Sequence, residues 1–397
     1  MLALVACLLA PSTALARSGD PDRTFGGDGR VVLGFGPYLS AAFTDVAIDS
    51  RGRIVAAGFY SVPFARRPVV FRFNPDGSLD RSFGAGGVVE PQLGGEGSIS
   101  GIAVDGADRI VLGGSLTSMA PDLVVARLLD SGDPDPDFAG GDGLLTVDVA
   151  GTAIEHATDL ALDPQGRILL AVSVVFSRPE LQFAVMRVTE SGAPDSSFGE
   201  DAIAGVNVGA AGFTAGVAVD SQGRVVLVGQ GGAFKGLQFA AARFDSAGRP
   251  DPGFDGDGWT MLGFGSAPPG ERVVDVAVDA QDRLLLVGGG GSRSALATRL
   301  LADGSPDPGF DGDGRVQLPL RESGSSGVAI DGEGRILMTG TMSAGTTSQA
   351  FLARLRPTGA LDRSFGGGGI VRDGFSTTSA SATAVAVDAA GRYLIAG

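Results

Sequence analysis

A ten-residue segment that recurs seven times constrains this chain more than any other feature. Its first copy runs from Val46 to Val55 and contains Asp49 and, four residues later, Arg53. The other copies carry the same pair at Asp105/Arg109, Asp163/Arg167, Asp220/Arg224, Asp279/Arg283, Asp331/Arg335 and Asp388/Arg392. An apolar-Ala-apolar stretch precedes each Asp, and Gly or Asp occupies a turn position that suits left-handed backbone. Each copy therefore predicts two antiparallel strands joined by a tight turn.

Two further strands are predicted in each repeat. A third apolar segment carries an arginine, and an Asp-x-x-Phe motif follows it at a fixed distance before the fourth strand, as in residues 29–33 and 314–318. The third-strand arginines are Arg72, Arg127, Arg187, Arg243, Arg299 and Arg354. The phenylalanines are Phe25, Phe83, Phe138, Phe198, Phe254, Phe310 and Phe365. We interpret these phenylalanines as plugs packed between repeats.

The period of the repeat indicates the architecture. Successive hairpin aspartates lie 52 to 59 residues apart, and four short strands in such a period are typical of a β-propeller blade. No helical periodicity interrupts the pattern. We predict an all-β fold, a seven-bladed β-propeller with four antiparallel strands per blade, forming a single domain over residues 17–397. The predicted repeats are 37–94, 95–150, 151–209, 210–265, 266–320, 321–375, and 376–397 together with 20–36.

The last repeat lacks strands of its own. The chain ends at Gly397, where a third strand is due, and residues 30–35 resemble a fourth strand that nothing precedes. We therefore expect the N-terminal strand to close the ring. One strand is then still missing, so the last blade is expected to be incomplete and the sequence to be truncated by about 15 to 30 residues.

The first sixteen residues are apolar and end in Ala14-Leu15-Ala16, which is typical of a signal peptide cleavage site. They are too short to span a bilayer as a helix, and the missing basic region suggests a start further upstream. A second interpretation is open, because residues 17–22 align with 130–135 and the preceding residues fall where a repeat strand would lie. We expect export to the periplasm, cell surface or medium, and cleavage would remove Cys7, the single cysteine.

Residues 52–58 read Gly-Arg-Ile-Val-Ala-Ala-Gly, and residues 351–369 contain Phe-Leu-Ala-Arg-Leu followed by Gly-Ala-Leu-Asp-Arg-Ser-Phe-Gly-Gly-Gly-Gly. These motifs resemble the delta-60 repeat of bacterial secreted and surface proteins. The resemblance covers essentially everything after Asp20. It implies tandem blades and export, and it provides no catalytic residues, since no biochemical activity is assigned to the family.

Three features of the sequence resemble metal or catalytic sites. The acidic turns 251–258 and 307–314 suit calcium, but the equivalent turns 26–29, 84–87 and 366–369 lack the full set of carboxylates, so we predict turn chemistry and no metal. The hairpin Asp and Arg fit an ion pair better than acid/base catalysis. His156, the only histidine, lies beside Glu155 without a nucleophile-elbow motif. No catalytic residue and no cofactor are predicted.

Loop lengths vary at only two places in the repeat, between the second and third strands and before the next hairpin. These loops leave the same edge of a blade, so we expect one variable-loop face, where recognition usually occurs. Its candidate binding residues are Tyr60, Phe64, Arg66, Arg67, Arg178, Glu180, Phe234, Lys235, Glu271, Arg272 and Arg293, with Arg321 and Glu322 beside them.

These observations favour an exported, non-enzymatic scaffold that binds a protein or glycan partner through the variable-loop face. The net charge of −15 argues against nucleic acid. We expect no membrane span and a monomer. One alternative is a calcium-dependent lactonase-like propeller enzyme, whose central metal would need ligands from the set Glu96, Glu155, Asn207, Glu271 and Glu322. Another alternative is a structural spacer without a ligand.

Overall fold

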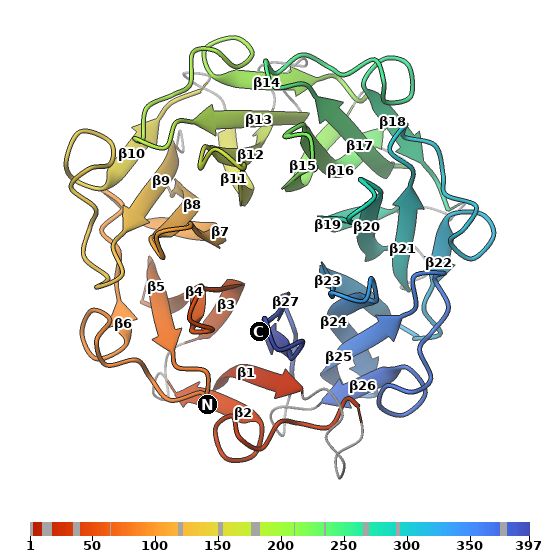
Figure 1. Ribbon diagram of the computed structural model, residues 1–397, viewed down its shortest axis with the longest axis horizontal. Coiled ribbons are helices and arrows are strands. Elements are labelled where there is room, and N and C mark those ends of the chain that lie inside the picture. Colours follow the sequence, from red (N-terminus) through yellow and green to blue (C-terminus); the bar gives the residue numbers. More distant parts are fainter. Residues whose placement is uncertain are drawn as a thin grey trace.

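The computed structural model of the protein describes residues 3–9, 18–34, 40–63, 65–117, 122–149, 154–175, 183–209, 211–233, 236–264, 270–290, 294–373 and 379–397. Its strands form four-stranded antiparallel sheets arranged radially around a central channel, with the first strand of each sheet innermost (Figure 1). The β-propeller architecture predicted from the repeat period is therefore confirmed.

Six blades are each built from four consecutive strands. Within each of these sheets, neighbouring strands are also neighbours in the sequence. The first three contain β3 (Ala41–Ile48), β4 (Ile54–Val62), β5 (Ala65–Phe73) and β6 (Val88–Val89); β7 (Gly97–Val104), β8 (Ile110–Leu116), β9 (Leu123–Leu128) and β10 (Leu144–Val147); and β11 (Ile154–Leu162), β12 (Ile168–Val175), β13 (Phe183–Val188) and β14 (Ile203–Val206). The next three contain β15 (Ala211–Val219), β16 (Val225–Gly232), β17 (Gln238–Phe244) and β18 (Trp259–Leu262); β19 (Arg272–Val278), β20 (Leu284–Gly289), β21 (Ala295–Leu300) and β22 (Arg315–Gln317); and β23 (Ser323–Ile330), β24 (Ile336–Ala344), β25 (Thr347–Leu355) and β26 (Ile370–Asp373).

The prediction of seven blades from seven repeats is wrong, and so is the predicted way in which the ring closes. Only six blades come from single repeats, and the seventh sheet is composite, with the order β2-β1-β28-β27. It joins β27 (Ala384–Val387) and β28 (Tyr393–Ala396) to β1 (Ala3–Leu9) and β2 (Arg30–Gly34). Both ends of the chain thus contribute two strands each.

Strand β1 occupies the third-strand position that was predicted to be missing. Its backbone pairs Ala6 with Ala396 of β28 and with Val31 of β2. The prediction of an incomplete last blade closed by a single N-terminal strand is therefore wrong. The reason is that a short apolar run is typical both of a signal peptide and of a buried strand. Cleavage after residue 16, which stays a prediction, would remove this strand.

The turns on the face opposite the variable loops tie neighbouring blades together. Each third-strand arginine donates from Nε to the aspartate of the following Asp-x-x-Phe motif at 2.7–2.9 Å. The same guanidinium lies 4.2–5.0 Å from the ring centroid of the motif's phenylalanine. All seven phenylalanines are fully buried. They therefore act as inter-blade plugs, and the arginine spans the blade boundary.

The hairpin Asp and Arg form the predicted cross-turn ion pair. In all seven copies Nε of the arginine lies 2.5–2.7 Å from Oδ2 of the aspartate. The other carboxylate oxygen caps the turn by accepting backbone N–H groups, as Asp49 does from Arg51 and Arg53. The aspartate is thus a turn residue in every copy.

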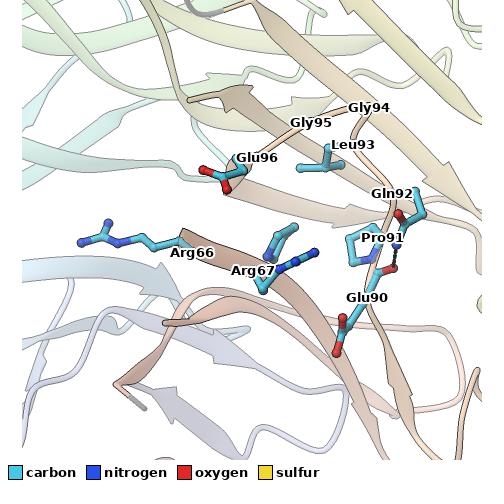
Figure 2. Close-up of a pocket in the computed structure, with 10 residues that line it drawn as sticks. Arg66, Arg67, Glu90, Pro91, Gln92, Leu93, Gly94, Gly95 and Glu96 are labelled. Carbon is cyan, nitrogen blue, oxygen red and sulfur yellow. Dashed lines mark hydrogen bonds between the residues drawn. The ribbon is translucent and has the colours of Figure 1, made fainter. Parts of the chain in front are cut away.

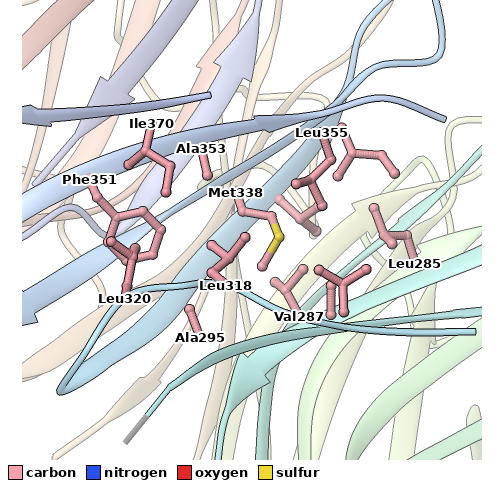
Figure 3. Close-up of a cluster of buried hydrophobic side chains, with 14 of the residues drawn as sticks. Leu285, Val287, Ala295, Leu318, Leu320, Met338, Phe351, Ala353, Leu355 and Ile370 are labelled. Atoms are coloured by element: carbon pink, nitrogen blue, oxygen red, sulfur yellow. The ribbon is translucent and has the colours of Figure 1, made fainter. Parts of the chain in front are cut away.

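Hydrophobic packing is concentrated between blades. In the cluster of Figure 3, Leu285 and Val287 of β20 pack with Met338 of β24 and Phe351 of β25, all at most 1% exposed. Similar clusters fill the other boundaries, so the hydrophobic core is divided into separate clusters between neighbouring blades around the channel. Such a scaffold presents its connecting loops at the two faces of the ring.

Candidate functional site

A cleft of about 300 Å³ opens on the variable-loop face between the first blade and the second. One side is the end of the β4–β5 hairpin, where Arg66, Arg67 and Pro68 begin β5. The other side is the segment 90–96 that joins β6 to β7 (Figure 2). The cleft therefore lies where two loops of variable length meet, as the loop-length pattern predicts for a binding site.

The arginines of the cleft are exposed and are not neutralised by the protein. Within the described residues neither Arg66 nor Arg67 forms an ion pair, in contrast to the arginines of the hairpins and third strands. The Arg66 guanidinium carbon lies 4.6 Å from the centroid of the Phe59 ring, which restricts the side chain through a cation–π contact. Two positively charged donors thus face solvent at one side of the cleft.

The opposite side supplies acceptors. Glu90 accepts a hydrogen bond of 2.8 Å from the Tyr60 hydroxyl, and Gln92 Nε2 donates to the Glu90 carbonyl at 3.2 Å. Burial and the interaction with Glu90 raise the pKa of Tyr60, so this phenol stays a neutral donor. Glu96 adds a second carboxylate at the inner end of the segment. The cleft therefore combines exposed guanidinium, carboxylate and amide groups, while Pro91 and Leu93, which also line it, are buried.

The structure brings together three of the predicted binding residues, Tyr60, Arg66 and Arg67, at this cleft. Arg272 is exposed at the start of β19, in a different blade. Glu271 is 3% exposed and its Oε1 accepts from the Phe264 backbone N–H at 2.7 Å, so its carboxylate is turned into the protein, and its role in binding stays a prediction. The predicted residues Phe64, Arg178, Glu180, Phe234, Lys235 and Arg293 lie outside the described residues.

The ligand set considered for a central metal does not converge. Glu155 is 1% exposed and accepts from the Val149 backbone N–H, and Asn207 accepts from that of Gly209. Glu96 belongs to the cleft, and Glu322 has left-handed backbone with φ of 47°. Among the described residues no cluster of three or more His, Cys, Asp or Glu side chains could hold a metal ion.

The central channel contains three carboxylates that the sequence analysis missed. Asp45, Asp159 and Asp275 follow a β-bulge in the inner strands β3, β11 and β19. Each lies four residues before a hairpin aspartate, and the same position in the other blades is Gly101, Gly216, Gly327 and, in the composite sheet, Ala384. This alternation of Asp and Gly is the signal that could have identified them.

Comparisons with known proteins give the fold and leave the activity open. A family model described as "Domain of unknown function (DUF5122) beta-propeller" matches residues 52–83 and 334–365, which are equivalent segments of the first and sixth blades. No curated protein sequence matches the chain. The part of the chain that the structure describes contains no helix long and apolar enough to cross a membrane.

Solved structures with a similar fold share little sequence with this chain. The periplasmic gluconolactonase of Pseudomonas aeruginosa has a TM-score of 0.50 at 12% identity, over 90% of this chain and 94% of that one. A protein of unknown function from Dyadobacter fermentans has a TM-score of 0.46 at 15% identity, over 77% and 91%. A gluconolactonase from Xanthomonas campestris has a TM-score of 0.39 at 15% identity, over 85% and 94%.

The comparisons correct one expectation. The chain was expected not to be an enzyme, but a gluconolactonase has the same fold, so the architecture gives no ground for excluding catalysis. At these identities the likeness establishes architecture and no substrate. The two matched segments and the strand order together show that the chain is a β-propeller built from repeats, two of which match the DUF5122 model.

Proposed function

We propose that the protein is exported and binds an acidic glycan in the cleft between the first two blades. The observation that carries the proposal is the pair of exposed guanidinium groups of Arg66 and Arg67, which have no ion-pair partner within the described residues, opposite the carboxylate-bearing segment 90–96.

The chemistry of the cleft matches both kinds of group on an acidic sugar. A guanidinium donates two parallel hydrogen bonds to a carboxylate, so Arg66 or Arg67 can fix a uronic acid group. Glu90, Gln92 and Glu96 are exposed and offer acceptors to sugar hydroxyls, whereas Pro91 and Leu93 are buried. A volume of about 300 Å³ is at the lower end of the range for small-ligand sites, which suits one short segment of a chain.

The test is binding to defined polysaccharides by affinity electrophoresis and calorimetry. We expect retention by polygalacturonate or another uronic acid polymer and none by neutral dextran. Arg66→Ala/Arg67→Ala should weaken binding at least about tenfold, which corresponds to the loss of roughly one charge-assisted hydrogen bond. Arg272→Ala, an exposed arginine on another blade, is the matched control and should bind like the wild type.

Two results would overturn the proposal. The first is that polygalacturonate, alginate and heparin all fail to bind the folded full chain. The second is that they bind equally well after both cleft arginines are replaced. Equal weakening by Arg272→Ala would assign the effect to general surface charge, which also contradicts a site at this cleft.

A further inference from the structure

The three channel carboxylates form identical bridges between neighbouring blades. Asp45 accepts at Oδ1 from the backbone N–H of Val46, the next residue, at 2.7 Å, and at Oδ2 from Ile102 N–H of the second blade at 2.9 Å. Its position after the bulge turns the carboxylate along the channel wall toward that blade. The side chain is half-buried against the channel.

The same arrangement occurs in the third and fifth blades. Asp159 accepts from Leu160 N–H at 2.7 Å and from Val217 N–H of the fourth blade at 2.9 Å. Asp275 accepts from Val276 N–H and from Val328 N–H of the sixth blade, both at 2.7 Å. Every second blade therefore holds the blade that follows it by one carboxylate.

The receiving blades carry glycine at the corresponding position, directly before the donating N–H. A Cβ at Gly101 would lie 2.6 Å from the backbone nitrogen of Leu160 in the third blade. At Gly216 it would lie 3.5 Å from Oδ2 of Asp159, within van der Waals contact. Small residues thus let inner strands approach closely, and the carboxylates alternate with them around the ring.

The charges of neighbouring channel carboxylates act on Asp159 and on Asp275. Burial is the largest effect and raises the pKa of Asp45 to about 6 and of Asp275 to about 7. The negative charge of Asp45 adds to the effect on Asp275. Burial, followed by the charges of Asp275 and Asp45, raises the pKa of Asp159 well above its ordinary value. The backbone hydrogen bonds oppose these shifts without cancelling them.

Among the described residues, no positively charged side chain pairs with the three carboxylates. The other titratable or charged residues on β3, β11, β19 and the strands packed against them are Cys7, Tyr60, Arg127, Glu155, His156, Arg243, Arg272 and Tyr393. Arg127 and Arg243 bind Asp135 and Asp251 in the turns of the opposite face, and Tyr393 binds Asp331. Among the described hydrogen bonds and ion pairs of the channel carboxylates, all partners are backbone N–H groups.

We infer that Asp45, Asp159 and Asp275 form a proton-binding centre in the channel, which ties alternate blades to their neighbours and makes the stability of the ring depend on pH. A protonated carboxyl keeps its carbonyl oxygen as an acceptor for one backbone N–H, its hydroxyl oxygen accepts the other N–H more weakly, and neutral carboxyls do not repel one another. Ionisation places up to three negative charges around one narrow channel. The ring is therefore tightest when the centre holds its protons.

The direction of the pH dependence follows from the shifts. Below the unfolded-state pKa of 3.8, folded and unfolded chains are both protonated and the full stabilisation is present. As the pH rises from there, the unfolded chain releases its protons first, so the unfolding equilibrium constant rises about tenfold per pH unit for each retained proton. The loss ends near pH 6 for Asp45 and near pH 7 for Asp275, where the folded state also ionises.

The experiment is urea unfolding of the full chain, followed by the fluorescence of Trp259, at pH values from about 4.5 to about 8. We expect the unfolding constant of the wild type to rise with pH between 4.5 and 7, with a slope that indicates two to three protons at the acidic end. Single substitutions Asp45→Asn, Asp159→Asn and Asp275→Asn should each reduce this slope by about one proton, that is, by about tenfold per pH unit.

The slope separates proton binding from a general loss of stability. A substitution that only destabilises the ring changes the free energy of unfolding by the same amount at every pH. Asp313→Asn, in an exposed turn where the carboxylate only caps Arg315 N–H, should leave the slope unchanged. His156→Gln removes the only histidine, an exposed side chain, and should also leave it unchanged. A wild-type slope near zero, or an undiminished slope in the Asn variants that fold, would overturn the inference.

Discussion

The buried arginine at each blade boundary permits a prediction of magnitude, and Arg187 is the best placed. Its side chain is 2% exposed and that of Asp195 11%. Its Nε donates to Asp195 Oδ2 at 2.7 Å, its Nη1 donates to the Ser246 carbonyl of the next blade at 2.7 Å, and its guanidinium carbon lies 4.2 Å from the centroid of the Phe198 ring. One side chain therefore makes an ion pair, an inter-blade hydrogen bond and a cation–π contact.

Arg187→Met keeps the apolar stem and removes all three interactions. Breaking one partner of a buried ion pair costs about 3–5 kcal/mol, and a desolvated cation–π contact adds about 1–2 kcal/mol. Asp195 still accepts from Ser197, and Arg167 lies 3.9 Å away, so the lower part of the range applies. We expect a loss of about 4 kcal/mol in the free energy of unfolding, measured by urea denaturation.

A second variant identifies the source of this loss. If the stranded Asp195 carboxylate dominates, then Arg187→Met/Asp195→Asn should recover at least about 1 kcal/mol relative to the single variant, because the amide oxygen still caps the turn without a buried charge. Arg272→Met, on an exposed arginine, should change stability by less than about 0.5 kcal/mol. A loss below about 1 kcal/mol for Arg187→Met, or no recovery in the double variant, would refute the reasoning.

Three further predictions concern backbone contacts and charge. Gly114→Ala would place a Cβ 2.0 Å from a carbonyl oxygen of the paired strand, so urea denaturation should show a loss of about 2 kcal/mol or more, whereas Gly106→Ala meets nothing within 4 Å and should be nearly neutral. Deleting residues 3–9 removes the pairing of β1 with β2 and β28. Calorimetry should therefore show a lower Tm, and limited trypsin digestion should show faster cleavage of the segment that follows. An unchanged Tm would favour removal of this segment as a signal peptide. Burial opposes the shift, but hydrogen bonds from Ser82 and the Arg72 charge lower the pKa of Asp80. Its stabilisation should therefore persist above pH 3.8 and disappear as the pH falls below that value, and Asp80→Asn should flatten this acid limb of the unfolding curve.

The blade architecture was predictable because each repeat encodes its own turns and strand pattern. Asp49 accepts from N–H groups two and four residues ahead, and Arg53 pairs with it across the same turn. These contacts lie within one repeat, so residue spacing suffices to infer them. The plug role of Phe83 was predictable for the same reason, since its partner Arg72 is in the preceding strand.

Strand β1 was not predictable in the same way. Its apolar sequence fits two roles, and the contacts that decide between them join Ala6 to Ala396, at the other end of the chain. Glu271 shows a related difficulty on a shorter scale. Its type and loop position suggested an exposed ligand-binding residue, whereas its carboxylate accepts from Phe264 N–H and is buried. Sequence spacing does not reveal which backbone groups a loop turns inward.

The channel carboxylates show the opposite case, in which a visible pattern was not used. Aspartate or glycine four residues before the hairpin aspartate alternates through six repeats, from Asp45 to Gly327. The glycines allow inner strands to approach closely, since a Cβ at Gly101 would lie 2.6 Å from the backbone nitrogen of Leu160 in the third blade. A comparison of repeats position by position would have identified the set.

The alternation cannot continue around a ring of seven sheets. With an odd number of sheets, two sheets that lack the carboxylate must lie side by side. This occurs at the composite sheet, where Ala384 follows Gly327. There Thr383 Oγ1 donates to the Phe43 carbonyl of the first blade at 2.9 Å. On the other side Arg354 Nη1 donates to Ser18 Oγ at 2.9 Å, and Arg30 pairs with Asp373 at 2.7 Å.

The sheet that joins the two ends of the chain is thus held by contacts that do not include the three channel carboxylates. Ionisation of the channel is then expected to loosen the boundaries that follow Asp45, Asp159 and Asp275 before it opens the closure. Hydrogen exchange at pH 5 and pH 8 can test this order, because the bridged N–H groups of Ile102, Val217 and Val328 should lose protection with rising pH. Equal loss of protection across β1 and β28 would instead indicate that the ring opens as a whole.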